Sequence, residues 1–256
     1  MQKQIHLIIY AVGLFLSAAA FAEMPATSGT CGTDCTWHFD SNTKTLSING
    51  TGQMNDYTAD LRAIETPWKA YSNDIENITI ANGIQNIGYG AFAYTNVKNV
   101  NIPDSVTSIG TYAFTGCDKL MAVDLPSNLK NIDHAAFYLT SIQNMNVPES
   151  VETIASAAFA ISSLQTLTIS DKTDLRPSLL NDGSPHGSPA AVVIYCKGNP
   201  DVCKQNVQNT ISNSNYANHP DILLKSKIWR QNRRIYTLDE ALHDAGKKNS
   251  VMIRYR

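Results

Sequence analysis

Five cysteines are the residues of this chain whose types and spacing could support chemistry. They form two local pairs, Cys31 with Cys35 and Cys196 with Cys203, and leave Cys117 without a near neighbour. A zinc site needs four thiolate or imidazole ligands, commonly arranged as two clusters. The histidines are not spaced relative to either pair in a way that suggests such a site, although a ligand distant in sequence would also serve. In an oxidising compartment, close pairs of this kind form disulfides instead.

Other reactive groups are scattered. The sequence contains no G-x-S-x-G, H-E-x-x-H or P-loop motif. His134, which follows Asp133, and His186 are expected to be solvated surface residues. We therefore expect no enzyme activity, no catalytic residue, no metal and no cofactor. The net charge of −2 over 256 residues also argues against specific nucleic-acid binding.

The first 22 residues predict export. A short basic start is followed by an apolar run and by Ala20-Phe21-Ala22, which is typical of a secretory signal peptide cleaved after Ala22. The alternative is a retained membrane anchor at 5–22, because this segment approaches the length that spans a bilayer. An extracellular, cell-surface or periplasmic location is expected, and it favours disulfides Cys31–Cys35 and Cys196–Cys203 with Cys117 free.

The strongest pattern in the chain is an internal repeat. Phenylalanines recur at spacings of 22, 23 and 22, and isoleucines recur in step with them. The two columns are Phe92, Phe114, Phe137 and Phe159, and Ile87, Ile109, Ile132 and Ile154. A period of 20–29 residues with one strand per repeat predicts a leucine-rich-repeat solenoid, in which stacked coils bury a continuous core. We expect a mostly β fold with short helices and about 4–5 coils of 22–23 residues.

The repeat resembles a known family. The segment VNIPDSVTSIGTYAFTGC at 100–117 is similar to the signature of BspA-like leucine-rich-repeat surface proteins, and 31–57 with Pro67-Trp68 resembles that family's N-terminal flank. The resemblance implies a bacterial exported protein that binds other molecules. Gly88 and Gly110 become Asp133 and Ala155 in later copies, and these turns are expected to differ in backbone shape.

The flanks divide the chain into five parts. A hairpin at 36–49 is expected to cap the first coil, AVVIY at 191–195 is expected to be the final strand, and 225–256 is expected to form a small β-α-β module. The predicted divisions are a signal peptide at 1–22, an N-terminal cap at 23–74, the solenoid at 75–206, a linker at 207–224 and the module at 225–256.

Charge is unevenly distributed between these parts. Residues 1–224 have a net charge of −8, whereas residues 225–256 have a net charge of +6. The basic tail could attach the protein to an anionic surface. Alternatively, its basic side chains are simply the hydrated surface of a small capping module. The candidate attachment residues are Arg230, Arg233, Arg234, Arg254 and Arg256.

The outward strand positions are the best candidates for a binding face. Alternation along each strand turns one polar residue per coil away from the core. These residues are Thr79, Asn101, Asp124, Asn146 and Thr168. They predict a non-enzymatic repeat protein that binds a protein or a glycan in the manner of an adhesin, although a merely solvated face has the same pattern. The alternative is a structural envelope protein attached by its tail. The sequence does not indicate an oligomeric state.

Overall fold

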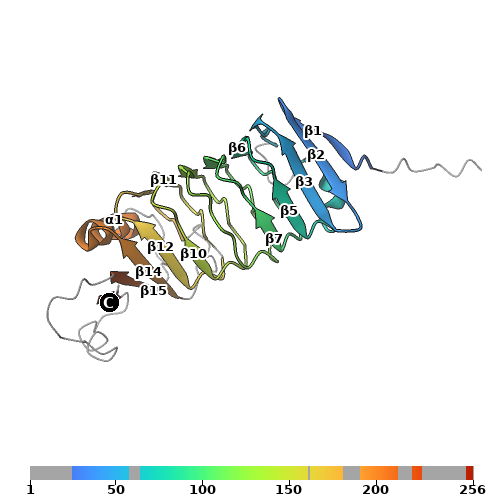
Figure 1. Cartoon of the computed structure of the whole chain (residues 1–256). Coiled ribbons are helices and arrows are strands. Elements are labelled where there is room, and N and C mark those ends of the chain that lie inside the picture. Colours follow the sequence, from blue (N-terminus) through green and yellow to red (C-terminus); the bar gives the residue numbers. More distant parts are fainter. Residues whose placement is uncertain are drawn as a thin grey trace, which may run out of the picture.

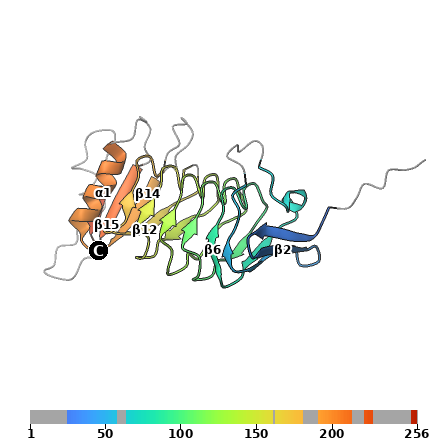
Figure 2. The same ribbon diagram turned by 90° about the horizontal axis from the view of Figure 1, so that it is seen from above.

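The computed structural model describes residues 25–57, 64–160, 162–180, 191–212, 221–226 and 252–255. These residues form an elongated β-solenoid whose coils stack from the N-terminal to the C-terminal end, as expected (Figure 1). The described part contains one α-helix, α1 (Pro200–Ser212), which lies at the C-terminal end of the stack (Figure 2). A 3-10 turn at Lys69–Tyr71 precedes the repeated phenylalanines.

One long side of the solenoid contains two five-stranded sheets. In the first, of order β1-β2-β3-β5-β7, the N-terminal strands are antiparallel and the later ones parallel. Its strands are β1 (Ser28–Gly32), β2 (Cys35–Asp40), β3 (Thr45–Gly50), β5 (Asn77–Ile80) and β7 (Asn99–Asn101). The second is parallel throughout. Its strands are β10 (Asn144–Asn146), β12 (Thr166–Ser170), β14 (Ala191–Lys197), β15 (Asp221–Ser226) and β16 (Met252–Tyr255).

A second side of each coil contributes a short strand to a six-stranded parallel sheet. The strands are β4 (Gly52–Gln53), β6 (Ile84–Ile87), β8 (Ser108–Ile109), β9 (Asn131–Ile132), β11 (Thr153–Ile154) and β13 (Asp174–Leu175). Each consists of only two to four residues because the chain turns at once toward the next side. This sheet continues without interruption past the point where the two five-stranded sheets separate.

Aromatic rings form the centre of the core. Trp68 contacts Phe92 with ring centroids 5.9 Å apart, and the repeated phenylalanines continue the stack at 5.3, 5.4 and 5.8 Å. All of these rings are buried. A single coil could not bury such a ring on both faces, and the neighbouring coils therefore supply the contacts that order it.

A column of small polar side chains lines the core beside the rings. In three coils a buried hydroxyl donates to the carbonyl of its own coil's phenylalanine, at 2.6 to 3.0 Å; the donors are Thr95, Thr140 and Ser162. In the remaining coil the equivalent residue is Cys117, whose Sγ lies 3.1 Å from the carbonyl oxygen of Phe92. Cys117 is therefore a packing residue in a position where hydroxyls otherwise occur.

The predicted N-terminal hairpin is present as β2 and β3, over residues 35–50. It places Trp37 against Trp68 with centroids 5.8 Å apart, so the hairpin covers the first coil. The strand β1 was not predicted. It pairs with β2 and is joined to it by the Cys31–Cys35 disulfide, with an S–S distance of 2.02 Å.

The C-terminal end differs from the expectation in two respects. The strand β14 is not the final one, because β15 and β16 pair beyond it in parallel. The linker expected at 207–224 is partly regular, since α1 extends to Ser212 and β15 begins at Asp221. The connection from β14 through α1 to β15 is a β-α-β unit, the crossover that parallel neighbours require.

The turns after the isoleucine column do not differ between copies as expected. The backbone N–H of Gly110, Asp133 and Ala155 each donates to the preceding coil's isoleucine carbonyl at 2.9 Å. Positive φ occurs two residues later, at Gly90, Tyr112, Ala135 and Ala157. The glycine at 110 instead permits close approach, because a Cβ there would lie 2.8 Å from the carbonyl oxygen of Ile87.

Several predictions fall outside the described residues. These are the signal peptide at 1–22, the helix of the C-terminal module, and the attachment residues Arg230, Arg233, Arg234 and Arg256. The strand expected at the end of that module is present as β16, which includes the backbone of Arg254.

Candidate binding face

The outward residues of the five-stranded sheets form a polar surface, here called the sheet face. It comprises the column predicted from the sequence and a flanking column two residues earlier in each coil. In the second and fourth coils Asn101, Asn146 and their flanking partners Asn99 and Asn144 are exposed, while the residues between them point toward the core. The flanking column is Asn77, Asn99, Ala122, Asn144 and Thr166.

Side-chain hydrogen bonds connect adjacent coils across this face. The amide Nδ2 of Asn99 donates to Oδ1 of Asn77 at 2.9 Å, and Thr166 Oγ1 donates to Asn144 Oδ1 at 2.6 Å. Each amide retains further donor and acceptor capacity. The face therefore presents oriented, uncharged hydrogen-bonding groups at the spacing of neighbouring strands, about 4.8 Å.

The column extends beyond the residues identified from the sequence. Strand register places His38 and Ser47 before Thr79, and Ser47 accepts a 3.1 Å hydrogen bond from Thr79 Oγ1. At the other end, register continues from Thr168 to Tyr195 and then to positions 225 and 254 of β15 and β16. The alternation within TWHF and AVVIY was the signal for His38 and Tyr195, but only strand pairing aligns them with the repeats.

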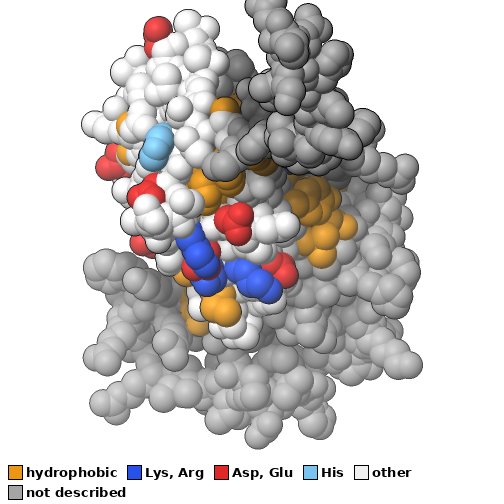
Figure 3. Space-filling model, turned by 90° about the vertical axis from the view of Figure 1, so that its right-hand side faces the viewer, with side chains coloured by type: hydrophobic (Ala, Val, Ile, Leu, Met, Phe, Trp, Pro, Cys, Tyr) orange, Lys and Arg blue, Asp and Glu red, His pale blue; other side chains and the backbone are white. Residues whose placement is uncertain are grey.

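One border of the sheet face carries paired charges of both signs. Glu76 lies between Lys44 and Lys98, with Oε–Nζ distances of 2.6 and 2.8 Å. Hydrogen bonds from Lys44 and Lys98 hold the pKa of this carboxyl at about 2. Both charge signs also lie side by side on the N-terminal end of the molecule (Figure 3). Such mixed surfaces do not form a single-sign field that would attract an oppositely charged partner.

The tyrosines on the opposite side of the coils contact neighbouring turns. Tyr112 lies edge-on between Tyr89 and His134, with centroid distances of 5.5 and 5.3 Å. Tyr94 is 49% exposed, and its ring covers Gly116 so closely that a Cβ there would clash with it. These contacts give the tyrosines a structural role in ordering the turns.

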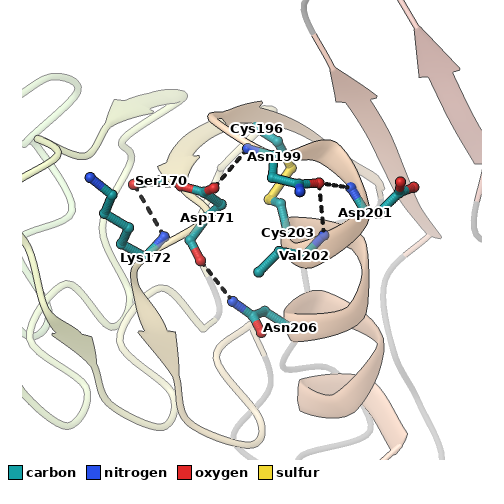
Figure 4. Close-up of a disulfide and its surroundings, with 9 residues drawn as sticks. All are labelled: Ser170, Asp171, Lys172, Cys196, Asn199, Asp201, Val202, Cys203 and Asn206. Atoms are coloured by element: carbon teal, nitrogen blue, oxygen red, sulfur yellow. Dashed lines mark hydrogen bonds between the residues drawn. A yellow bond between two sulfur atoms is a disulfide. The ribbon is translucent and has the colours of Figure 1, made fainter.

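The C-terminal disulfide joins β14 to α1. Cys196 and Cys203 are bonded at 2.05 Å, and Asn199 begins the helix by accepting the backbone N–H of Asp201 at 2.9 Å (Figure 4). Asp171, from the preceding coil, accepts the N–H of Asn199 at 2.7 Å. The surroundings of this disulfide hold a helix against the solenoid, with Asn199 as N-cap and Pro200 in the first helical position.

The described residues outside the sheet face give little support for catalysis or metal binding. Burial and the Thr95 hydrogen bond act in opposite directions on Cys117, and burial dominates, raising its pKa to about 12. Asp133 has a raised pKa because of burial and the nearby charge of Asp56. Among the described residues, no three His, Cys, Asp or Glu side chains are placed to hold a metal ion. None of the described helices has the length and apolar character needed to cross a membrane.

Known proteins resemble this chain in its repeats. The model of the BspA type leucine rich repeat region matches residues 68–182 in 6 copies. A leucine-rich repeat protein from Eubacterium ventriosum has the same fold, with a TM-score of 0.52 and 17% identity over 78% of this chain and 63% of that protein. The T. pallidum leucine rich repeat protein TpLRR gives a TM-score of 0.44 and 17% identity over 74% of this chain and 99% of that one. This chain thus spans less than two thirds of the length of the E. ventriosum protein. No curated protein sequence matches it.

Proposed function

Because residues 68–182 match the model of the BspA type leucine rich repeat region, we propose that this chain is an exported, non-enzymatic protein that binds a protein partner through its sheet face. Export to the cell surface or beyond is expected from the sequence of residues 1–22. The two disulfides fit an oxidising compartment. Fold alone does not define a ligand, so the proposal depends on the site.

The observation that carries the proposal is the sheet face itself. Exposed asparagine and threonine side chains lie on the outer side of the first, second and fourth coils, and hydrogen bonds join the first coil to the second and the fourth coil to the fifth. Solenoids use such extended surfaces to contact partners over several repeats. A glycan would also use these amides, and it is the alternative outcome of the test.

The test measures which components of a cell-surface extract are captured by the full chain and by two double variants of it. Asn101→Arg with Asn146→Arg places bulky charges on the face, whereas Gln53→Arg with Thr107→Arg places the same charges on exposed positions of the six-stranded side. We expect only the first pair to abolish capture. Equal capture by both variants would exclude the sheet face. Loss of capture after deglycosylation of the extract, but not after proteolysis, would identify a glycan partner.

A second candidate is envelope attachment by the basic module at 225–256. The net charge of +6 in this segment favours it, whereas the pairing of β15 with β14 and of β16 with β15 supports a capping role. Replacing Arg230, Arg233 and Arg234 by Gln separates the two. Attachment predicts release from anionic vesicles, with binding that weakens as salt rises. Capping predicts that deletion of 225–256 lowers the melting temperature.

A further inference from the structure

The third coil interrupts both five-stranded sheets. The first sheet ends at β7 and the second begins at β10, and the segment Met121–Leu125 lies between them in the order of coils. Within the described ranges, no backbone or side-chain hydrogen bond involves any residue of this segment. Equivalent segments of the coils on either side form strands.

An extra residue explains the interruption. The buried corner residues Val97 and Leu120 are 23 positions apart, whereas Thr95 and Cys117 are 22 apart. The additional residue therefore lies in the corner Asp118–Lys119, directly before the interrupted segment. Both ends of this corner remain buried, so the longer connection displaces the strand that follows it. Val123 and Leu125 are accordingly only partly buried.

The same segment is where the sheet face changes character. Met121 is 65% exposed, and its equivalents in the neighbouring coils are Lys98 and Gln143. Ala122 is exposed in the column that otherwise contains asparagine and threonine. A long apolar side chain and a small one thus occur together at the centre of a polar surface.

Asp124 adds a charge to this apolar position. It is the one carboxylate in the column Thr79, Asn101, Asp124, Asn146 and Thr168, and it is exposed. Among the described residues it makes no ion pair, whereas Glu76 and Glu152 at nearby borders each pair with lysine. Its charge is therefore available to a cation from outside.

We infer that Met121–Asp124 determines the specificity of the sheet face and fits an extended peptide carrying a basic side chain next to an apolar one. Asp124 receives the cation, and Met121 and Ala122 cover the apolar side chain. The inference rests on the proposed function, because it assumes that the sheet face is where a partner binds.

The probe is a phage-displayed library of random peptides selected on the full chain. We expect the selected peptides to be enriched in Lys or Arg adjacent to a large apolar residue. Asp124→Asn should weaken them about fivefold, the upper range for an exposed ion pair. Met121→Gln should weaken them about tenfold through lost apolar contact. Asp124→Lys should change the selected charge from basic to acidic.

A matched control keeps the charge constant. Asp124→Asn combined with Asn146→Asp moves the carboxylate one coil away from Met121, and we expect it to bind the selected peptides as weakly as Asp124→Asn alone. Unchanged binding in this variant and in Met121→Gln would overturn the inference. If Asn101→Arg with Asn146→Arg still abolished binding, the sheet face would stand as the binding surface and only the assignment of its specificity would fail. If the selection recovers no binding peptide, or only peptides whose binding is unchanged by every variant of the sheet face, both the proposed function and this inference are wrong.

Discussion

The indole of Trp68 stacks on Phe92 at 28° between ring planes, so the aromatic column starts one coil before the first repeated phenylalanine. Trp68 Nε1 donates to the carbonyl oxygen of Ala91 at 3.0 Å, which satisfies the buried N–H group. The tryptophan therefore begins the stack of rings, and the buried Trp37 of the hairpin packs edge-on against it at 69° between ring planes. The stability of the solenoid depends on this continuous stack.

Replacement of Phe114 by Ala is expected to lower the free energy of unfolding by about 3–5 kcal/mol. Phe114 is fully buried between Phe92 and Phe137, with ring distances of 5.3 and 5.4 Å. Denaturant melts of the two proteins measure the difference. Phe114→Leu, which keeps most of the volume, is the control and should lose less. A loss below about 1 kcal/mol for the alanine variant would contradict burial of the column.

The thiol count of the unreduced protein should be one. Cys117 is the free cysteine, and its raised pKa of about 12 leaves almost no thiolate at neutral pH. We expect no alkylation in the native protein and one alkylated thiol after denaturation, measured by mass. Three or five alkylated thiols would show that one or both disulfides are absent. Cys117→Thr, the residue of two neighbouring coils, should leave stability within about 1 kcal/mol of the parent.

Asp133→Asn is expected to stabilise the protein at neutral pH. Burial, and then the charge of Asp56, raise the folded pKa of Asp133 above its ordinary value of 3.8. A raised carboxyl pKa means that stability falls as pH increases from the unfolded pKa through the folded one. The amide variant lacks this loss, so its advantage should vanish below about pH 4. Unfolding free energies from acid to neutral pH provide the measurement, with exposed Asp118→Asn as the control. A variant that is less stable than the parent at neutral pH would refute the assignment.

Backbone amides of Ala122–Leu125 should exchange with solvent much faster than those of β12. The reason is that β12 is paired on both sides, whereas the third-coil segment has no hydrogen bond within the described part of the chain. Hydrogen exchange followed by mass spectrometry distinguishes the two segments. Similar protection in both would mean that the sheet continues through the third coil.

The repeat predicted the core and the outward columns because burial recurs with the same period as the sequence. Phe114 is buried like its equivalents one coil away, and Asn101 is exposed like Thr79 and Asp124, so one alignment assigns burial to them all. The interruption at Met121 could not be derived in this way. The sequence shows a spacing of 23 residues between Phe114 and Phe137, but its structural effect depends on which side of the coil contains the extra residue.

The C-terminal strands were harder for a different reason. Asp221–Ser226 is a short apolar run between polar segments, and it becomes a strand only by pairing with Ala191–Cys196, thirty residues away. Nonlocal pairing of this kind leaves no periodic signal in a single sequence. Likewise, the pairing of β1 with β2 follows from the Cys31–Cys35 link and not from the composition of SGTCG.

The interrupted sheet also determines how the solenoid responds to mechanical load. At the third coil the β8–β9 pairing and the contact between Phe114 and Phe137 continue across the boundary, while the opposite side has no ladder to break. Hydrogen bonds from the N–H groups of Phe114 and Gly116 to the carbonyls of Ala136 and Tyr138 also join the second coil to the third. Opening the sheet-face side there breaks no strand ladder, whereas between other coils each ladder bond that is broken costs about 1 kcal/mol. We therefore expect the sheet face to bend more readily at Met121–Asp124 than at the coils on either side.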